Sequence, residues 1–212
     1  MDNPTAPLTD FPFTTEKMSN SGALFDLVKL QDISKEVLCR MSAEEVYAGL
    51  LDWAKRYDGE FAALLEGDKD YALRILNIGR GGDRPRKDMY NWKQATAFLS
   101  FYYPSRFQVE DDFPVDQEKK QAILSRYLEL VDFQDSSETW FGKVKQICEE
   151  QNYALQPKKY KKDPDAYAGS IVEVSNTIRV AITGRQNSPD LWEIMLALGE
   201  AESRRRLNAA LN

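Results

Sequence analysis

From Ser42 onward, one amphipathic helical segment follows another, and each carries its own start or stop signal. Ser42 and Glu45 stand at the spacing of a capping box, and apolar residues then recur every three or four positions. Later helices are expected to begin at Asp58, Asp68, Asp88, Asp116 and Ser188, with stops at Gly79, Pro104 and Gly199. Neither strand–helix alternation nor a fixed-period repeat occurs, so the sequence predicts an all-α fold.

One segment, residues 171–183, is ambiguous. Its β-branched residues suit a strand, but its isoleucines also fall on one helical face. Ser170 before it and Gly184 after it suit the two caps of a helix. We therefore expect a helix here, followed by another in which Ser188 is the N-cap and Pro189 lies in the first turn.

The chain contains no histidine, which removes the commonest general base and metal ligand and every Ser-His or Cys-His nucleophile pair. Its two cysteines, Cys39 and Cys148, lie far apart among apolar neighbours, so we expect buried, reduced thiols. No C-x-x-C motif supports a zinc site. Most classes of enzyme are therefore disfavoured.

The 212 residues suffice for one sizeable core or two small ones. No apolar run approaches the roughly 18 residues that a membrane helix needs. The N-terminus has neither the basic start nor the apolar core of a secretion signal. The sequence therefore predicts a cytoplasmic protein without a membrane segment.

The net charge of −6 argues against a nucleic-acid partner when it is taken alone. The charge is uneven, however: residues 110–118 are strongly acidic, whereas residues 80–87, 158–162 and 204–206 are basic. A partner meets the local potential and not the sum, so the basic runs keep a phosphate-bearing partner open. A solvated surface is the plainer interpretation of each run.

Residues 16–22, "EKMSNSG", resemble the Lys-Met-Ser-Lys-Ser loop of class I aminoacyl-tRNA synthetases. Asn20 replaces the second lysine, and a neutral amide cannot stabilise phosphoryl charge. The family's His-x-Gly-His element is absent as well, so we interpret this stretch as a turn at residues 21–22. The apolar residues that follow are expected to pack into the helical body; they are Leu24, Phe25, Leu27, Val28 and Leu30.

Three further stretches, in order, resemble the C-terminal anticodon-binding region of bacterial glutamyl-tRNA synthetases. They are "SGALFDLVKLQDISKEVL" (21–38) with "MSAEEV" (41–46), "RPRKD" (84–88), and "IRVAITGRQNSPDLWEIMLALGE" (178–200), and "LNAAL" (207–211) closes the chain as it does in that family. The resemblance covers about residue 16 to the end. The family's catalytic and stem-contact domains would lie upstream.

The resemblance implies two consecutive helical subdomains, at residues 22–90 and 91–212, after a linker or truncated stem-contact remnant at residues 1–21. It implies recognition of the anticodon loop of a glutamate-specific tRNA, in support of glutamyl-tRNA formation. The parent enzyme would use ATP and Mg²⁺, whereas this part alone would be inactive, without a cofactor, and monomeric.

The resemblance also implies the site. Arg86 would read the third anticodon base, because a guanidinium fork can bond a base edge and Pro85 fixes the turn that carries it. The other implied anticodon contacts are Arg179, Ser188, Pro189 and Leu191, and Arg80, Arg84 and Lys87 would add phosphate contacts. We expect Arg86 and residues 179–191 to form one RNA face.

Plainer interpretations stay open for these residues. Ser188 and Pro189 would cap any helix, and Leu191 could pack in the core. Arg179 lies among Ile178, Val180 and Ile182 and needs a partner. Of the four tryptophans, Trp192 could be partly exposed beside the site. The alternative function is a helical protein–protein interaction domain without RNA binding, and a free-standing enzyme is the weakest hypothesis.

Overall fold

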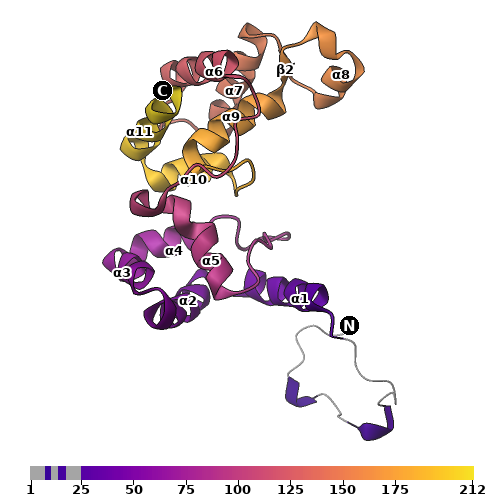
Figure 1. Ribbon diagram of the computed structural model, residues 1–212, viewed down its shortest axis with the longest axis vertical. Coiled ribbons are helices and arrows are strands. Elements are labelled where there is room, and N and C mark those ends of the chain that lie inside the picture. The colour runs from indigo at the N-terminus through magenta and orange to yellow at the C-terminus, as the bar shows by residue number, and fades with distance from the viewer. Residues whose placement is uncertain (1–7, 11–13, 18–24) are drawn as a thin grey trace.

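The computed structural model describes residues 8–10, 14–17 and 25–212. The short 3-10 turns η1 (Leu8–Asp10) and η2 (Thr15–Lys17) precede the helical body. The turn expected at residues 21–22, the packing of Leu24 and most of the expected linker 1–21 lie outside the described residues. The all-α prediction is confirmed, since helices make up nearly all of the regular structure in the described part (Figure 1).

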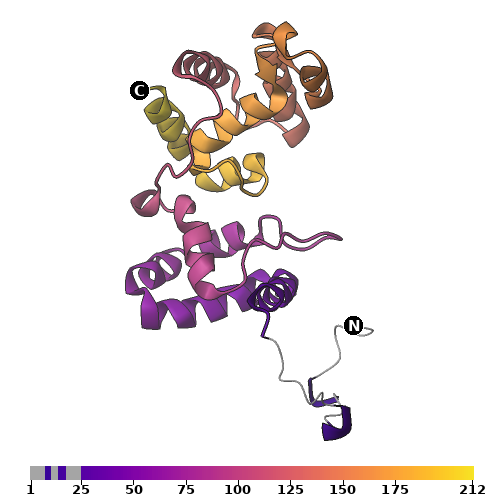
Figure 2. The same cartoon turned by 45° about the vertical axis from the view of Figure 1, so that its right-hand side comes forward.

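The helices form two groups stacked along the long axis (Figures 1 and 2). The first group holds α1 (Leu27–Arg40), α2 (Ala43–Tyr57), α3 (Gly59–Gly67), α4 (Lys69–Asn77) and α5 (Trp92–Leu99), followed by η3 (Ser100–Tyr102) and η4 (Pro104–Arg106). The second group holds α6 (Gln117–Leu130), α7 (Ser137–Glu150), α8 (Pro157–Lys162), η5 (Pro164–Ala166), α9 (Ile171–Thr183), α10 (Leu191–Leu198) and α11 (Glu200–Leu211). Two parallel two-residue strands, β1 (Tyr153–Ala154) and β2 (Gly169–Ser170), flank α8.

Most of the predicted helix ends are confirmed. The capping box of α2 forms, with Ser42 N donating to Glu45 Oε2 at 2.7 Å and Glu45 N donating to Ser42 Oγ at 3.1 Å. The ambiguous segment is a helix, α9, with a second capping box between Ser170 and Glu173 and with Gly184 as its left-handed C-cap. The caps predicted at Asp58, Asp68 and Asp116 are also present.

Two predicted caps are wrong, and side-chain hydrogen bonds outside the helices explain both. Helix α5 begins after Asn91, whose side chain accepts from Gln94 N at 2.8 Å, because the carboxylate of Asp88 is taken by Arg86. Helix α10 begins after Asp190 and not after Ser188. Arg179 binds the Ser188 hydroxyl, which is therefore not available to the helix.

The packing expected at the start of the helical body is wrong for α1. Phe25 is 75% exposed and Val28 is 67% exposed, and Leu27 and Leu30 are exposed too. Ile33 and Val37 of the same helix are exposed as well. Helix α1 reaches away from the first group (Figure 1), so its apolar side lacks a cover within the described part of the chain.

Two expectations about the interior have different outcomes. Cys39 and Cys148 are buried free thiols, as expected. Trp192 is also buried and stacks on Trp140 with 5.6 Å between ring centroids, so its expected exposure is wrong. In the described part of the chain, no helix is both long and apolar enough to cross a membrane.

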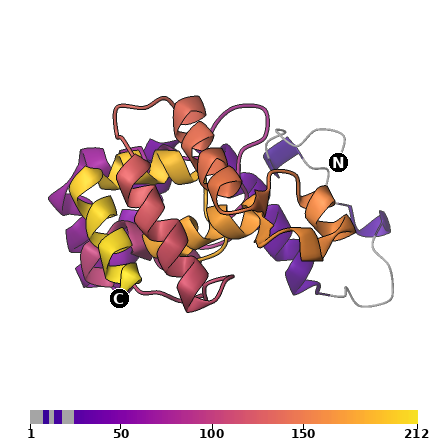
Figure 3. The same ribbon diagram turned by 90° about the horizontal axis from the view of Figure 1, so that it is seen from above.

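Contacts at the junction between the two groups hold α4 and α10 so that they face each other. Arg185, which follows α9, donates to Glu110 Oε1 at 2.6 Å and to the carbonyl oxygen of Ala97 in α5 at 2.8 Å. Helix α5 packs on α2, so the boundary expected between residues 90 and 91 falls inside the first group. Seen along the long axis (Figure 3), α8 in orange and the C-terminus lie on opposite sides of the molecule.

Candidate functional site

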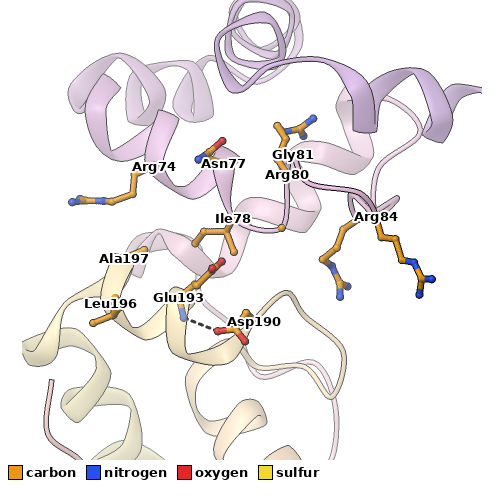
Figure 4. Close-up of a pocket in the computed structure, with 12 residues that line it drawn as sticks. Arg74, Asn77, Ile78, Arg80, Gly81, Arg84, Asp190, Glu193, Leu196 and Ala197 are labelled. Atoms are coloured by element: carbon orange, nitrogen blue, oxygen red, sulfur yellow. Dashed lines mark hydrogen bonds between the residues drawn. The ribbon is translucent and has the colours of Figure 1, made fainter. Parts of the chain in front are cut away.

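A cleft of about 600 Å³ lies between the two groups of helices (Figure 4). Its first wall comes from α4 and the segment after it, and its second wall comes from α10. The lining residues are Arg74, Asn77, Ile78, Gly79, Arg80, Gly81, Arg84 and Arg86 on the first wall, and Asp190, Glu193, Leu196 and Ala197 on the second. We call this hollow the cleft; it holds four arginines and two carboxylates, so it is net positive in a protein of net charge −6.

Arg86 is anchored at both its backbone and its side chain. Its backbone N–H donates to the carbonyl oxygen of Gly79 at 2.9 Å. Its Nε donates to Asp88 Oδ2 at 2.6 Å and its Nη2 donates to Asp88 Oδ1 at 2.8 Å. These hydrogen bonds raise the pKa of the guanidinium, which stays charged. With 35% of its side chain exposed, Arg86 presents a fixed cation to the cleft.

Arg179 holds the loop in front of α10 and does not line the cleft. Its Nη1 donates to the carbonyl oxygen of Pro189 at 2.7 Å, to that of Ser188 at 3.3 Å and to the Ser188 hydroxyl. Burial lowers the pKa of Arg179. These oxygens accept hydrogen bonds from its guanidinium, which makes no ion pair with another described residue. This is the partner that the sequence requires for an arginine among aliphatic residues.

The expectation that Arg86 and residues 179–191 form one RNA face stays a prediction: Asp190 lines the same cleft as Arg86, but Arg179, Ser188, Pro189 and Leu191 do not. Three predicted contacts are nevertheless buried: Ser188, Pro189 and Leu191, the last only 2% exposed. Their side chains are therefore not available as a surface for a base in this structure. They shape the loop and anchor α10, and the exposed apolar surface of that wall is Leu196 instead.

The three predicted phosphate contacts differ in how free they are. Arg80 donates to the carbonyl oxygens of Leu38 and Met41 at 2.6 and 3.0 Å, so it ties the end of α1 to α4. Lys87 pairs with Glu36. Arg84 is exposed and makes no ion pair or side-chain hydrogen bond with the described residues, so it alone among the three is free for a phosphate.

Sequence reasoning does not single out four of the lining residues: Arg74, Asn77, Glu193 and Leu196. Arg74 is exposed, stacks over Tyr71 at 5.4 Å from the ring centroid and lies at one end of the cleft, with Arg84 at the other (Figure 4). Spacing along the chain shows only that Arg74 lies one turn before Ile78, the C-cap of α4, and that Glu193 and Leu196 lie three apart on α10; it does not show that the two helices face each other.

Replacing Arg179 with methionine is expected to lower the free energy of unfolding by about 2 kcal/mol, because the buried oxygens of Ser188 and Pro189 lose their donor. Chemical denaturation measures the change. Replacing the exposed Arg56 with methionine is the matched control, and it should change stability by less than about 0.5 kcal/mol. Equal effects of the two substitutions would contradict the role of Arg179 in holding this loop.

The first comparison with known proteins concerns the part of the chain that forms the second wall of the cleft. A family model described as an anticodon binding domain matches residues 170–211, which contain α9, α10 and α11. A solved structure, that of the glutamate-tRNA synthetase from Elizabethkingia anophelis, resembles the fold with a TM-score of 0.56 and 18% identity. The likeness covers 94% of this chain and 34% of that one, and at this identity it bears on the fold alone.

Curated relatives match the whole chain at higher identity. The chain is 46% identical over 213 residues to a glutamate–tRNA ligase of Acetivibrio thermocellus, which covers 100% of this chain and 39% of that protein. It is 42% identical to one of Sorangium cellulosum and 37% identical to one of Clostridium perfringens, each over 97% of this chain. These matches span 37% and 39% of the two ligases, so the chain is about two fifths as long as the relatives it matches.

Proposed function

The chain is related along its whole length to glutamate–tRNA ligases and carries an anticodon-binding domain at residues 170–211, and from this premise we propose that the cleft binds the anticodon loop of a glutamate tRNA. Binding there would support the formation of glutamyl-tRNA in protein biosynthesis. The observation that carries the proposal is the cleft itself. Arginines of one helical group face the start of a helix of the other group across it.

The chemistry of the cleft suits an anticodon loop. Unpaired bases of such a loop can be splayed out, stacked and hydrogen-bonded on their edges. Arg86 offers a pre-aimed guanidinium to one base edge, and Leu196 offers an apolar surface on the facing wall. Arg74 and Arg84, at the two ends, are placed to meet phosphates, which position an RNA without specifying it.

The residues implied by the resemblance keep roles in this proposal. Arg86 reads the third anticodon base. Arg179 positions the loop of Ser188 and Pro189, and Leu191 fixes α10 in the core behind that loop. Contacts from Ser188 and Pro189 would come through their backbone, because their side chains are buried.

The ligase reaction would take place elsewhere. The chain spans about two fifths of its relatives, so we propose that ATP and Mg²⁺ act in the remainder of the parent protein. Among the described residues, no group of three or more Cys, Asp or Glu side chains is arranged to hold a metal ion. We further propose that this chain binds tRNA as a cytoplasmic monomer and catalyses nothing on its own.

A fluorescence titration with a glutamate anticodon stem-loop tests the proposal. We expect binding at about 50 mM salt that weakens several-fold by about 200 mM, since each neutralised phosphate releases counterions. A stem-loop of the same length with a scrambled loop sequence is the control and should bind more weakly. Absence of binding to the glutamate stem-loop at low salt would overturn the proposal.

Charge reversal at the two free arginines should weaken binding. Arg74→Glu and Arg84→Glu are each expected to raise the Kd about three- to ten-fold at low salt, and the effect should shrink as salt rises. Lys145→Glu on α7 makes the same change of charge at a place away from the cleft. It should leave the Kd within about two-fold of the wild-type value. An equal loss in all three variants would show that overall charge, and not the cleft, governs binding.

Binding to another protein is the second candidate function. A specific observation away from the cleft favours it. Helix α1 exposes Leu27, Val28, Leu30, Ile33 and Val37, and Phe25 just before it is exposed too. Large apolar side chains exposed together on one short segment are typical of a protein interface. This segment lies on a different helix from those that line the cleft, so the two functions do not compete for residues.

A further inference from the structure

The carboxylate of Asp88 occupies only one edge of the Arg86 guanidinium. A guanidinium carries five N–H donors in a fixed plane. Asp88 takes the Nε–H and one hydrogen of Nη2, at 2.6 and 2.8 Å. Both hydrogens of Nη1 and the second one of Nη2 remain, and they donate no hydrogen bond to the described residues. The edge of Arg86 between Nη1 and Nη2 is therefore open.

Asp88 lies behind Arg86 as seen from the cleft. Arg86 lines the cleft, whereas Asp88 does not. Both residues line a small hollow of about 20 Å³ on the other side, together with apolar Met89 and Leu99. The side chain of Asp88 is 20% exposed against 35% for Arg86. A ligand in the cleft would thus meet Arg86 and not the carboxylate that holds it.

Gly79 fixes the stem of the same side chain. Its φ of +69° lies in the left-handed region. A Cβ on Gly79 would come within 2.7 Å of Arg86 Cδ and 3.1 Å of Arg86 Cγ, so the arginine stem lies directly against the backbone of Gly79. Gly79 confines the aliphatic stem of Arg86, and Asp88 confines its guanidinium. The guanidinium is therefore left with a single orientation.

We propose that Asp88 is a positioning residue that sets which edge of Arg86 faces the cleft and thereby sets the base selectivity of the site. This inference rests on the proposed function. The open edge donates two parallel N–H bonds, which suit a base with two adjacent acceptors, such as N3 and O2 of cytosine. Uracil separates its two carbonyl acceptors by an N–H donor and meets that edge less well. Without Asp88, Arg86 keeps its charge but loses its fixed direction.

The test compares the Kd values of stem-loops that carry cytosine or uracil at the third anticodon position. Asp88→Ala is expected to lower the cytosine-over-uracil ratio roughly ten-fold. Affinity for the uracil loop should stay the same or rise slightly, because a negative charge near the RNA is lost. Asp88→Asn, which keeps the size of the side chain and one acceptor, should lower the ratio less than Asp88→Ala does.

A double-mutant cycle separates positioning from a structural role. If Asp88 acts through Arg86, the ratio measured for Arg86→Ala should not change further in Arg86→Ala/Asp88→Ala. Glu36→Gln is the matched control, since it removes the carboxylate partner of the adjacent Lys87, and it should leave the ratio unchanged.

The outcomes distinguish the two proposals. If the wild-type chain binds and discriminates but Asp88→Ala keeps the ratio, or weakens both loops equally, the positioning role is overturned and the proposed function stands. If the wild-type chain binds neither loop, the proposed function falls and the positioning role falls with it. A ratio lowered in Asp88→Ala and unaffected by Glu36→Gln supports the role.

Discussion

Replacing Gly184 with alanine is expected to lower the free energy of unfolding by about 2–4 kcal/mol. Gly184 ends α9 with a φ of +75°, which an alanine adopts only with strain. A Cβ there would come within 2.0 Å of the backbone oxygen of Gln108. That backbone cannot move away freely, because the N–H groups of Glu110 and Asp111 both donate to the Gly184 oxygen, at 2.9 and 3.0 Å.

Chemical denaturation of the two glycine variants measures this effect. Gly142→Ala is the matched control, because Gly142 lies on the exposed side of α7 and an added Cβ would meet nothing within 4 Å. That substitution should stabilise the protein by up to about 1 kcal/mol, since alanine is the better helix former. A loss of less than about 1 kcal/mol in Gly184→Ala would contradict the close packing at this junction.

Replacing Arg86 with alanine is expected to abolish discrimination at the third anticodon base. A bidentate guanidinium contact to a base edge contributes about 1–3 kcal/mol of selectivity, which corresponds to roughly a five- to 150-fold difference in Kd. Arg86→Lys keeps the positive charge but not the planar fork, so it should retain more affinity than alanine while losing most of the discrimination.

The measurement is the set of Kd values for four stem-loops that differ only at the third anticodon base. Arg86→Ala also leaves Asp88 without its partner, and this unpaired carboxylate would weaken all four loops alike. The variant Arg86→Ala/Asp88→Ala removes that effect and isolates the loss of base reading. An Arg86→Ala chain that still ranks the four bases as the wild type does would assign the selectivity to another residue.

Sequence pattern predicts the fold well where local chemistry decides the outcome. The capping boxes at Ser42 and Ser170 and the left-handed stop at Gly184 depend on residues within one turn of a helix end. Such signals survive in the folded protein because no distant group competes for the capping side chains. The helix over Ile171–Thr183 was therefore predictable despite its β-branched residues.

Prediction from sequence fails where a distant side chain takes a local one. Arg179 comes nine residues before Ser188 in the chain, yet it removes the serine hydroxyl from helix capping and moves the start of α10 to Leu191. Asp88 is lost as a cap for a local reason instead, because its carboxylate accepts from Arg86, two residues before it. Both failures lie beside the cleft, as expected where side chains are arranged for binding and not only for local structure.

The cleft itself was predictable only in part. The resemblance implies that Arg86 and residues 179–191 form one face, and of the latter only Asp190 lines the cleft with Arg86. Arg74 and Glu193 line the cleft because α4 and α10 face each other. The sequence of either helix alone does not predict this packing. The exposure of the apolar residues of α1 was not predictable for the same reason. Their pattern in the sequence indicates that they need a partner, but it does not indicate where in the structure that partner lies.

Mapping the anticodon stem-loop on the protein tests the central claim most directly. In a titration of the ¹⁵N-labelled chain, the account predicts the largest amide shift changes at the cleft, from Arg74 to Arg86 and from Asp190 to Ala197, and small changes in α1 and α8. Specific binding with the largest changes confined to α8 or α1, and an undisturbed cleft, would contradict it.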